Sequence, residues 1–138
     1  MSLPSPSVTP RGTVLLVDDE ALLRHVLARC LTDAGFDVIE AEDGQAALAA
    51  LSSCRDSLQL VITDINMPGM DGVEFAREFR PLCPRVPILF ITGRETGSLN
   101  GPRLDPDELL LKPFGPDVFL QRVVQMLARE FDAGRPSA

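Results

Sequence analysis

The 138-residue chain has no tryptophan, no tyrosine and only seven phenylalanines. Aromatic side chains on which nucleic-acid bases could stack are therefore scarce. Basic residues are also in the minority, because 13 Lys and Arg against 20 Asp and Glu leave a formal net charge of −7. A protein that binds nucleic acid by neutralising phosphates needs the opposite balance. We therefore expect no nucleic-acid partner.

Long apolar runs are absent as well. No stretch approaches the roughly 18 apolar residues that a membrane-spanning helix needs, and the opening MSLPSPSVTPRG lacks the apolar core of a secretory signal. The three cysteines, Cys30, Cys54 and Cys83, are an odd number without paired spacing. This pattern argues against a disulfide framework or a zinc site and favours reduced thiols. These absences predict a cytoplasmic protein with no membrane partner.

The composition that remains, 45% hydrophobic and 24% charged, is typical of one globular domain. The first residues are rich in Pro and Ser, and the last few are similar. Such segments seldom pack, so they predict loose tails. We expect an N-terminal tail over 1–11, one domain over 12–132 and a C-terminal tail over 133–138.

Apolar runs alternate with helical patterns along the domain. Predicted strands cover 13–20, 36–41, 58–64, 86–92 and 108–113. Predicted helices cover 21–34, 44–53, with Asp43 as its N-cap, 73–80 and a stretch starting at Pro116. This alternation predicts an α/β fold, in which helices cover both faces of a parallel sheet through right-handed crossovers. Segment 93–107 is rich in Gly and Pro, so only a short or irregular helical turn is expected there.

Polar residues stand at the ends of four predicted strands. They are Asp18, Asp19 and Glu20 after the first strand, Asp64 after the third, Thr92 after the fourth and Lys112 after the fifth. Ligands of open parallel sheets bind beyond the carboxyl ends of the strands. We therefore expect these side chains to share one edge of the sheet.

Clustered carboxylates repel one another unless a cation neutralises them, and Lys112 alone cannot balance three. Mg²⁺ fits such an oxygen-rich site. Asp19 and Asp64 are the expected direct ligands, with Asp18 binding directly or through water and the backbone carbonyl of Asn66 as a further ligand.

A carboxylate beside Mg²⁺, an ammonium and a hydroxyl is suited to phosphoryl transfer onto an aspartate. Asp64 is the better nucleophile candidate because it stands alone at its strand end, whereas Asp18 and Asp19 form an acidic pair. Lys112 would carry charge on the transferring oxygens, and Thr92 could hydrogen-bond the attached phosphoryl group.

The stretches VLLVDDE, LVITDINMPGMDG, ILFITG and LLLKPF resemble the signature stretches of the receiver domain of two-component response regulators, in the same order over roughly residues 12–131. The resemblance implies a flavodoxin-like (βα)₅ doubly wound sheet with strand order 2-1-3-4-5. It also implies Mg²⁺-dependent phosphorylation of Asp64 by a phosphohistidine, on a sensor histidine kinase or a phosphotransfer protein.

Carried over position by position, the resemblance makes Asp18 and Asp19 the acidic pair, Asp64 the phosphoacceptor, Thr92 the switch hydroxyl and Lys112 the phosphate-binding lysine. It also implies a cis Lys112–Pro113 bond. Such a protein is a signalling phosphoacceptor, not an enzyme in the ordinary sense. It regulates a downstream protein, here unknown, and we expect no output domain.

The sequence departs from the family pattern at several positions. Leu109 stands where the family usually has an aromatic switch residue, and segment 93–107 is poor in helix formers where the family has its fourth helix. Asn66 and Arg94 occupy the two positions that tune dephosphorylation in the family, but they do not predict a lifetime.

Two other functions compete with phosphoacceptor signalling. An aspartyl-phosphate phosphatase would want a second acid two residues after the nucleophile, where this chain has Asn66. A receiver-shaped interaction module without phosphotransfer is compatible with the departures at Leu109 and in 93–107. Within the signalling class, a free-standing regulator, a phosphorelay shuttle and an excised receiver of a hybrid kinase all fit the sequence. His25 lies inside a predicted helix, with no acid or second His at ligand spacing, which favours a surface or packing role.

Overall fold

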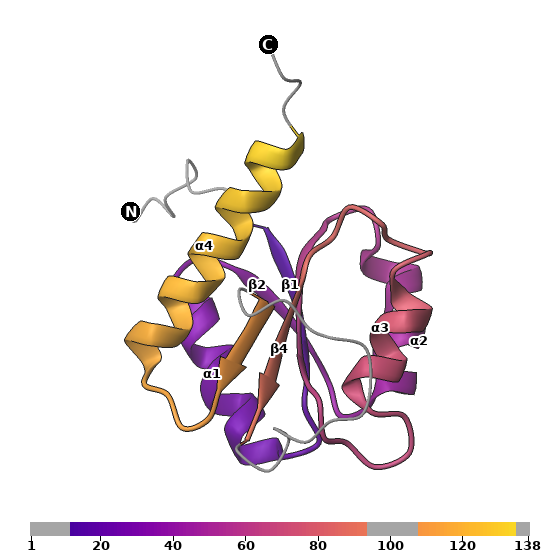
Figure 1. Cartoon of the computed structure of the whole chain (residues 1–138), viewed down its shortest axis with the longest axis horizontal. Coiled ribbons are helices and arrows are strands. Elements are labelled where there is room, and N and C mark those ends of the chain that lie inside the picture. Colours follow the sequence, from indigo (N-terminus) through magenta and orange to yellow (C-terminus); the bar gives the residue numbers. More distant parts are fainter. Residues whose placement is uncertain (1–11, 94–107, 135–138) are drawn as a thin grey trace, which may run out of the picture.

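The fold alternates strands and helices along the chain. The computed structural model describes residues 12–93 and 108–134. The elements are β1 (Thr13–Val17), α1 (Ala21–Asp33), β2 (Asp37–Ala41), α2 (Gly44–Cys54), β3 (Leu58–Asp64), α3 (Gly72–Phe79), β4 (Ile88–Thr92), β5 (Leu109–Leu111) and α4 (Pro116–Gly134) (Figure 1). Every strand and helix range named from the sequence has its counterpart, with ends that differ by a few residues.

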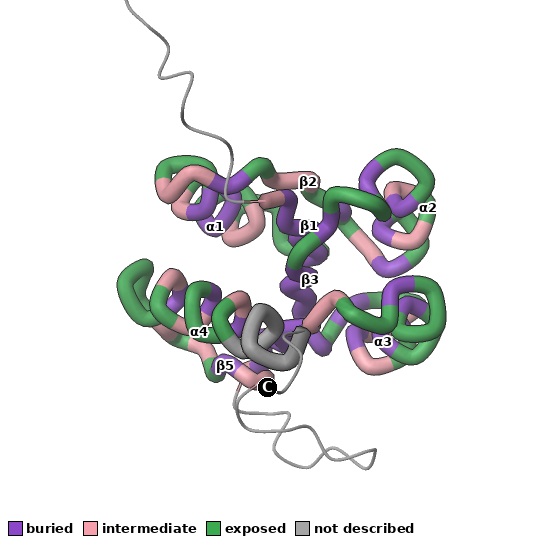
Figure 2. The backbone as a smooth tube through the Cα atoms, turned by 90° about the horizontal axis from the view of Figure 1, so that it is seen from above, coloured by how far each residue is buried: buried purple, intermediate pink, exposed green. Residues whose placement is uncertain are grey.

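The strands form one parallel five-stranded sheet in the order β2-β1-β3-β4-β5. Helices α1 and α4 cover one face, and α2 and α3 cover the other (Figure 2). The predicted flavodoxin-like, doubly wound fold with strand order 2-1-3-4-5 is therefore confirmed. Parallel strands of this kind bring their carboxyl ends to one edge of the sheet.

The core is split into two layers because the central strands are buried on both faces. Along β1, Leu15 and Val17 belong to the cluster on the α2 and α3 side. Val14 and Leu16 belong to the cluster on the α1 and α4 side. Successive side chains of a strand point to opposite faces. An unbroken apolar run is therefore what a covered parallel strand requires, and polar residues are tolerated only where the strand ends.

Helices α2 and α3 begin at aspartate caps. The predicted cap Asp43 accepts a hydrogen bond from the backbone N–H of Ala46 at 2.7 Å. Asp71 and Glu74 form a reciprocal capping box, in which each carboxylate accepts from the other residue's backbone N–H, at 2.8 and 2.9 Å. Caps of this kind typically contribute about 1 kcal/mol each.

Several further expectations can be compared with the structure. The peptide bond between Lys112 and Pro113 is cis, as the resemblance implied. All three cysteines are free thiols. Helix α4 continues to Gly134, two residues past the boundary expected at 132. The expectations for residues 1–11, 94–107 and 135–138 fall outside the described residues. Within the described part of the chain, no helix has the length and apolar character to cross a bilayer.

Candidate functional site

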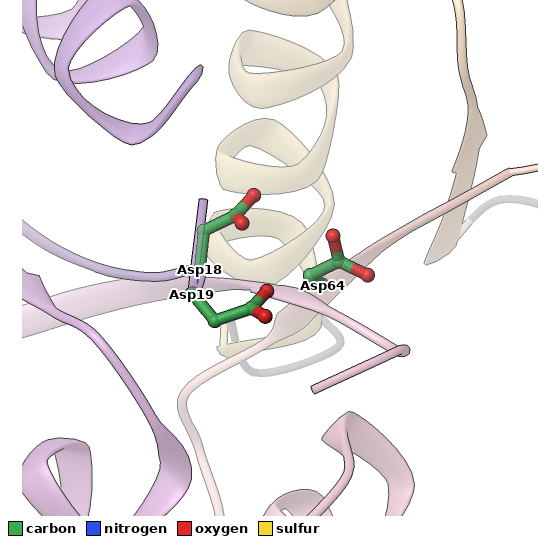
Figure 3. Close-up of side chains that lie close together, drawn as sticks. All are labelled: Asp18, Asp19 and Asp64. Carbon is green, nitrogen blue, oxygen red and sulfur yellow. The ribbon is translucent and has the colours of Figure 1, made fainter. Parts of the chain in front are cut away.

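Three carboxylates meet at the carboxyl ends of β1 and β3. Asp18 and Asp19 follow β1 and Asp64 ends β3, and one oxygen from each lies within 4.8 Å of the others (Figure 3). Asp18 and Asp64 are buried, whereas Asp19 is exposed. The two central strands are hydrogen-bonded neighbours. Their shared edge therefore brings together acids that are more than 40 residues apart in the chain, as predicted.

Asp18 is held by its backbone and by one of its two carboxylate oxygens. Its N–H donates to the carbonyl of Ala41 on β2 at 3.1 Å, and its Oδ1 accepts from the N–H of Glu20 at 2.8 Å. Its Oδ2 is the one buried side-chain oxygen or nitrogen without a hydrogen-bond partner in the part of the chain that the structure describes. Burial, reinforced by the charges of Asp64 and Asp19, raises the pKa of Asp18 to about 6 despite the hydrogen bond from Glu20.

Asp64 has a donor on each carboxylate oxygen. Its Oδ1 accepts from the N–H of Asn66 at 2.8 Å, which closes the turn after β3. Its Oδ2 accepts from the Lys112 ammonium at 2.9 Å. Burial alone would lower the pKa of Lys112, but the hydrogen bond and charge of Asp64, with the charge of Asp18, raise it. Lys112 is therefore a stable cation directly beside the predicted nucleophile.

Thr92 ends β4, the strand beside β3. Its backbone carbonyl accepts from the N–H of Lys112 at 2.8 Å, so Thr92 also anchors the start of the turn that carries the lysine. Its buried hydroxyl donates to the carbonyl of Gly93 at 3.3 Å. The structure thus places Thr92 at the predicted edge, with its hydroxyl directed to a neighbouring carbonyl.

The predicted residues without a charge or hydroxyl are also accounted for. Asn66 is exposed, directly after the end of β3, and its backbone already contacts Asp64. His25 lies on the surface of α1 with 63% of its side chain exposed, as its predicted surface role requires. Leu109 is half-buried on β5 and packs against the core on the α2 and α3 side.

Three residues near the site have no place in the sequence-based prediction. Gly72 begins α3 directly against the end of β3. Arg24 of α1 contacts the backbone of Asp18, and Glu40 of β2 contacts Arg24. The Arg24–Glu40 contact joins residues 16 positions apart, so no local pattern predicts it. The one sequence signal for it is that the two residues carry opposite charges and lie in segments expected to be neighbours.

Gly72 is required by the close approach of α3 to β3. A Cβ atom at this position would lie 2.3 Å from the carbonyl oxygen of Asp64 and 2.8 Å from Cα of Ile65. We expect Gly72→Ala to reduce the free energy of unfolding by about 1–3 kcal/mol, the usual cost of overpacking, and to displace Asp64. Urea unfolding measures this loss. Gly115→Ala is the matched control, because nothing lies within 4 Å of the added Cβ atom there. Equal stability of the two variants would contradict this account.

The acidic group has the features of a divalent-cation site. All three side chains offer carboxylate oxygens as ligand atoms, and hard cations prefer oxygen ligands. The orphaned Oδ2 of buried Asp18 needs a partner that the described residues do not provide, and a cation would supply one. Lys112 forms its ion pair with Asp64. Within the described residues, no cation is paired with Asp18 or Asp19, so their negative charge is not balanced in this way.

Comparison with known proteins identifies the family of this chain. The family model described as "Response regulator receiver domain" matches residues 14–124. The chain belongs to this family. Receiver domains bind a divalent metal at an acidic cluster, and this receiver has a group of three such acids in Asp18, Asp19 and Asp64. Receiver domains also interact with histidine kinases and phosphotransfer partners.

Individual relatives agree with this assignment. The receiver is 36% identical over 126 residues to the aerobic respiration control protein ArcA of Escherichia coli, covering 90% of this chain and 52% of ArcA. It is 37% identical over 118 residues to the uncharacterized transcriptional regulatory protein YrkP of Bacillus subtilis, covering 84% of this chain and 49% of YrkP. The chain therefore spans about half the length of these curated relatives.

A solved structure shows the same arrangement. The receiver domain of the hybrid histidine kinase CckA superposes with a TM-score of 0.70 at 32% identity, covering 84% of this chain and 99% of that one. The resemblance seen in the four signature stretches thus extends to the three-dimensional fold.

Proposed function

We propose that this receiver accepts a phosphoryl group on Asp64 from the phosphohistidine of a histidine kinase or phosphotransfer protein, in the cytoplasm. The reaction depends on Mg²⁺, and the modified chain changes conformation to regulate a partner protein. One observation carries the proposal: the Asp64 carboxylate contacts Lys112 at 2.9 Å and lies within 4.8 Å of the carboxylates of Asp18 and Asp19. The chain would act as a signalling phosphoacceptor and catalyse only its own phosphorylation and dephosphorylation.

Asp64 is suited to be the nucleophile because its neighbours orient its carboxylate and place a cation beside it. The Asn66 N–H and the Lys112 ammonium each fix one of its oxygens. In the transfer, one Asp64 oxygen forms a bond to phosphorus while the bond from phosphorus to the donor breaks, and the donor keeps the electron pair. Lys112 has two further N–H donors with which it can follow the charge onto the phosphoryl oxygens.

Asp18, Asp19 and Asp64 would hold the metal, with the Asn66 carbonyl as a further ligand. Mg²⁺ supplies positive charge that neutralises both the carboxylates and the phosphoryl oxygens. The Oδ2 atom of Asp18, which has no donor among residues 12–93 and 108–134, is the oxygen most in need of such a partner.

The conformational response would pass through Thr92 and not through an aromatic ring. The Thr92 hydroxyl can exchange the 3.3 Å contact with Gly93 for a phosphoryl oxygen, which is a stronger, charged acceptor. Such an exchange pulls on the segment that follows β4. Leu109, which replaces the family's aromatic residue, is half-buried and cannot report the change by rotating a ring.

The test of this function uses acetyl phosphate as the donor. Incubation with acetyl phosphate and Mg²⁺ should add the mass of one phosphoryl group to the intact chain, and chelation of the metal should prevent the gain. Borohydride reduction followed by peptide mapping should place the acyl phosphate at Asp64. Steady release of phosphate from many phosphate esters would instead favour a phosphatase. An unchanged NMR spectrum on addition of beryllofluoride would favour the interaction module without phosphotransfer.

Lys112→Ala separates the ammonium's role from that of the metal. We expect phosphorylation by acetyl phosphate to slow by about tenfold to a hundredfold, because a donor aimed at the developing charge is lost. Metal affinity should be kept or increased, since a positive charge leaves the carboxylates. Mass spectrometry and Mg²⁺ titration measure the two effects. Loss of metal affinity alone, with a normal rate at saturating Mg²⁺, would contradict the assigned role, and Lys112→Arg tests whether charge without the ammonium's shape suffices.

A further inference from the structure

The guanidinium of Arg24 connects the turn of Asp18 and Asp19, which follows β1, to the neighbouring strand β2. Its Nη1 donates to the backbone carbonyl of Asp18 at 2.7 Å, and its Nε donates to Oε1 of Glu40 at 3.0 Å. Only 12% of the Arg24 side chain is exposed, although it starts from the first turn of a surface helix. An arginine so placed is limited in its conformations by two acceptors on different elements, because its fork of donors is planar and rigid.

The strand that carries Glu40 also holds Asp18 directly. In the sheet, β2 lies beside β1, with Glu40 opposite Leu16 and Ala41 opposite Val17. The carbonyl of Ala41 accepts the N–H of Asp18 at 3.1 Å. The end of β2 therefore holds both sides of the Asp18 backbone, its N–H directly and its carbonyl through Arg24.

We propose that Arg24 and Glu40 are positioning residues that hold the turn of Asp18 and Asp19 in the geometry that binds the divalent cation. The need for such a brace is electrostatic, because consecutive acids beside Asp64 repel one another and would spread apart without a fixed backbone. The pair is internally neutral, so it can restrain the turn and leave the negative charge of the site for the cation. Second-sphere contacts of this kind commonly affect metal affinity by about 10- to 100-fold.

Two nearby pairs clarify why the role falls to Arg24. His25 also approaches Glu40, with Nε2 at 3.4 Å from Oε1, and its side chain is 63% exposed. Among the described residues, it forms no hydrogen bond or ion pair with Asp18 or Asp19. Arg29 pairs with Asp33 on the same helix at 3.1 Å, with 78% and 64% of these side chains exposed. Exposed pairs such as this one contribute little, so Arg29 is the matched control for removing an arginine from α1.

The test measures the dissociation constant of Mg²⁺ for the whole, unphosphorylated chain by calorimetric titration, at a temperature where urea curves show every variant folded. Arg24→Met should weaken binding by about tenfold, and Arg29→Met should leave it unchanged. Glu40→Gln should weaken Mg²⁺ binding less than Arg24→Met does. The variant that carries both substitutions should bind like Arg24→Met alone, because Glu40 acts on the turn only through Arg24. Arg24→Lys should restore part of the affinity, since one ammonium cannot serve both acceptors in the same way.

Wild-type affinity in Arg24→Met, additive losses in the double variant, or an equal loss in Arg29→Met would each overturn the proposal. If Arg24→Met does not fold, Glu40→Gln compared with Asp33→Asn carries the same test. A second readout is the rate of phosphorylation by acetyl phosphate, which in Arg24→Met should fall at low Mg²⁺ and return to near the wild-type value at saturating Mg²⁺. A rate that stays low at saturation would also count against positioning.

The inference rests on the proposed function only in treating the acidic group as a metal site. The calorimetric test contains no phosphoryl donor. If the chain binds Mg²⁺ with the expected dependence on Arg24 but never accepts a phosphoryl group, the inference holds and the proposed function fails. If the chain becomes phosphorylated while Arg24→Met binds Mg²⁺ normally, the function holds and the inference fails.

Discussion

Asp64→Asn is expected to lower phosphoryl uptake from acetyl phosphate by at least about a thousandfold, to below detection by intact-mass analysis. The amide oxygen of asparagine is a far weaker nucleophile than a carboxylate, and an amide cannot form an acyl phosphate. The fold should persist. The new side chain can still accept the hydrogen bond that the Asn66 N–H gives to Asp64 at 2.8 Å, and loss of the Lys112 ion pair is offset by weaker repulsion from Asp18.

The control for this variant is Asp56→Asn, which removes an exposed acid outside the site. It should accept the phosphoryl group at the wild-type rate, so that a less negative net charge cannot explain the loss in Asp64→Asn. Circular dichroism and urea unfolding establish that both variants are folded. Phosphoryl uptake by folded Asp64→Asn at an appreciable rate would show that another residue is the acceptor, and the proposed role of Asp64 would be wrong.

Asp18→Asn is expected to stabilise the metal-free chain at pH 7 while removing most of its affinity for Mg²⁺. The folded state raises the pKa of Asp18 from 3.8 to about 6, so the buried, ionised carboxylate opposes folding at neutral pH. Its removal should increase the free energy of unfolding in EDTA by about 2 kcal/mol, which is less than the full shift corresponds to because solvent screens part of the effect. In excess Mg²⁺ the order should reverse, since only the wild type gains stability from binding.

The pH dependence follows from the direction of the same shift. A carboxyl group whose pKa is higher in the folded state binds more protons there, so its contribution favours folding fully below pH 3.8 and is lost as the pH rises through about 6. The difference in unfolding free energy between Asp18→Asn and the wild type, both in EDTA, should therefore grow from pH 4 to pH 7. Asp19→Asn, at an exposed position, should increase the free energy of unfolding in EDTA at pH 7 by less than Asp18→Asn does. A difference that is constant with pH would contradict the assigned burial of Asp18.

The Asp18→Asn variant also separates what metal binding requires of this residue from what the stability of the fold requires. Asp18 lowers the stability of the metal-free chain, because its buried Oδ2, which has no donor within the described segments, has lost its hydration without replacement. A residue that weakens the fold of the empty chain and serves a ligand is a common feature of functional sites. The trade-off predicted for Asp18→Asn is a direct measurement of it.

Much of the architecture could be predicted from the sequence because it depends on local chemistry. The unbroken apolar run that includes Leu60, Val61 and Ile62 predicts a strand covered on both faces, and the acid that ends it places Asp64 at the edge of the sheet. The cap at Asp43 also follows from one residue type beside a helical pattern. The pattern predicts a helix over 73–80, whereas α3 runs from Gly72 to Phe79. It begins at Gly72 because α3 contacts β3 there, a constraint that the local pattern does not contain.

The sequence by itself determined the fold class and predicted the edge of the sheet where Asp18, Asp19, Asp64, Thr92 and Lys112 stand, because strand patterns and their terminal residues are encoded locally. Only the tertiary structure decided how these groups are held. The ion pair of Lys112 with Asp64 and the Arg24–Glu40 contact join distant segments, and Oδ2 of Asp18 is buried without a hydrogen-bond partner among the described residues. Such contacts depend on side-chain direction and burial after the sheet has formed, and a linear pattern contains neither.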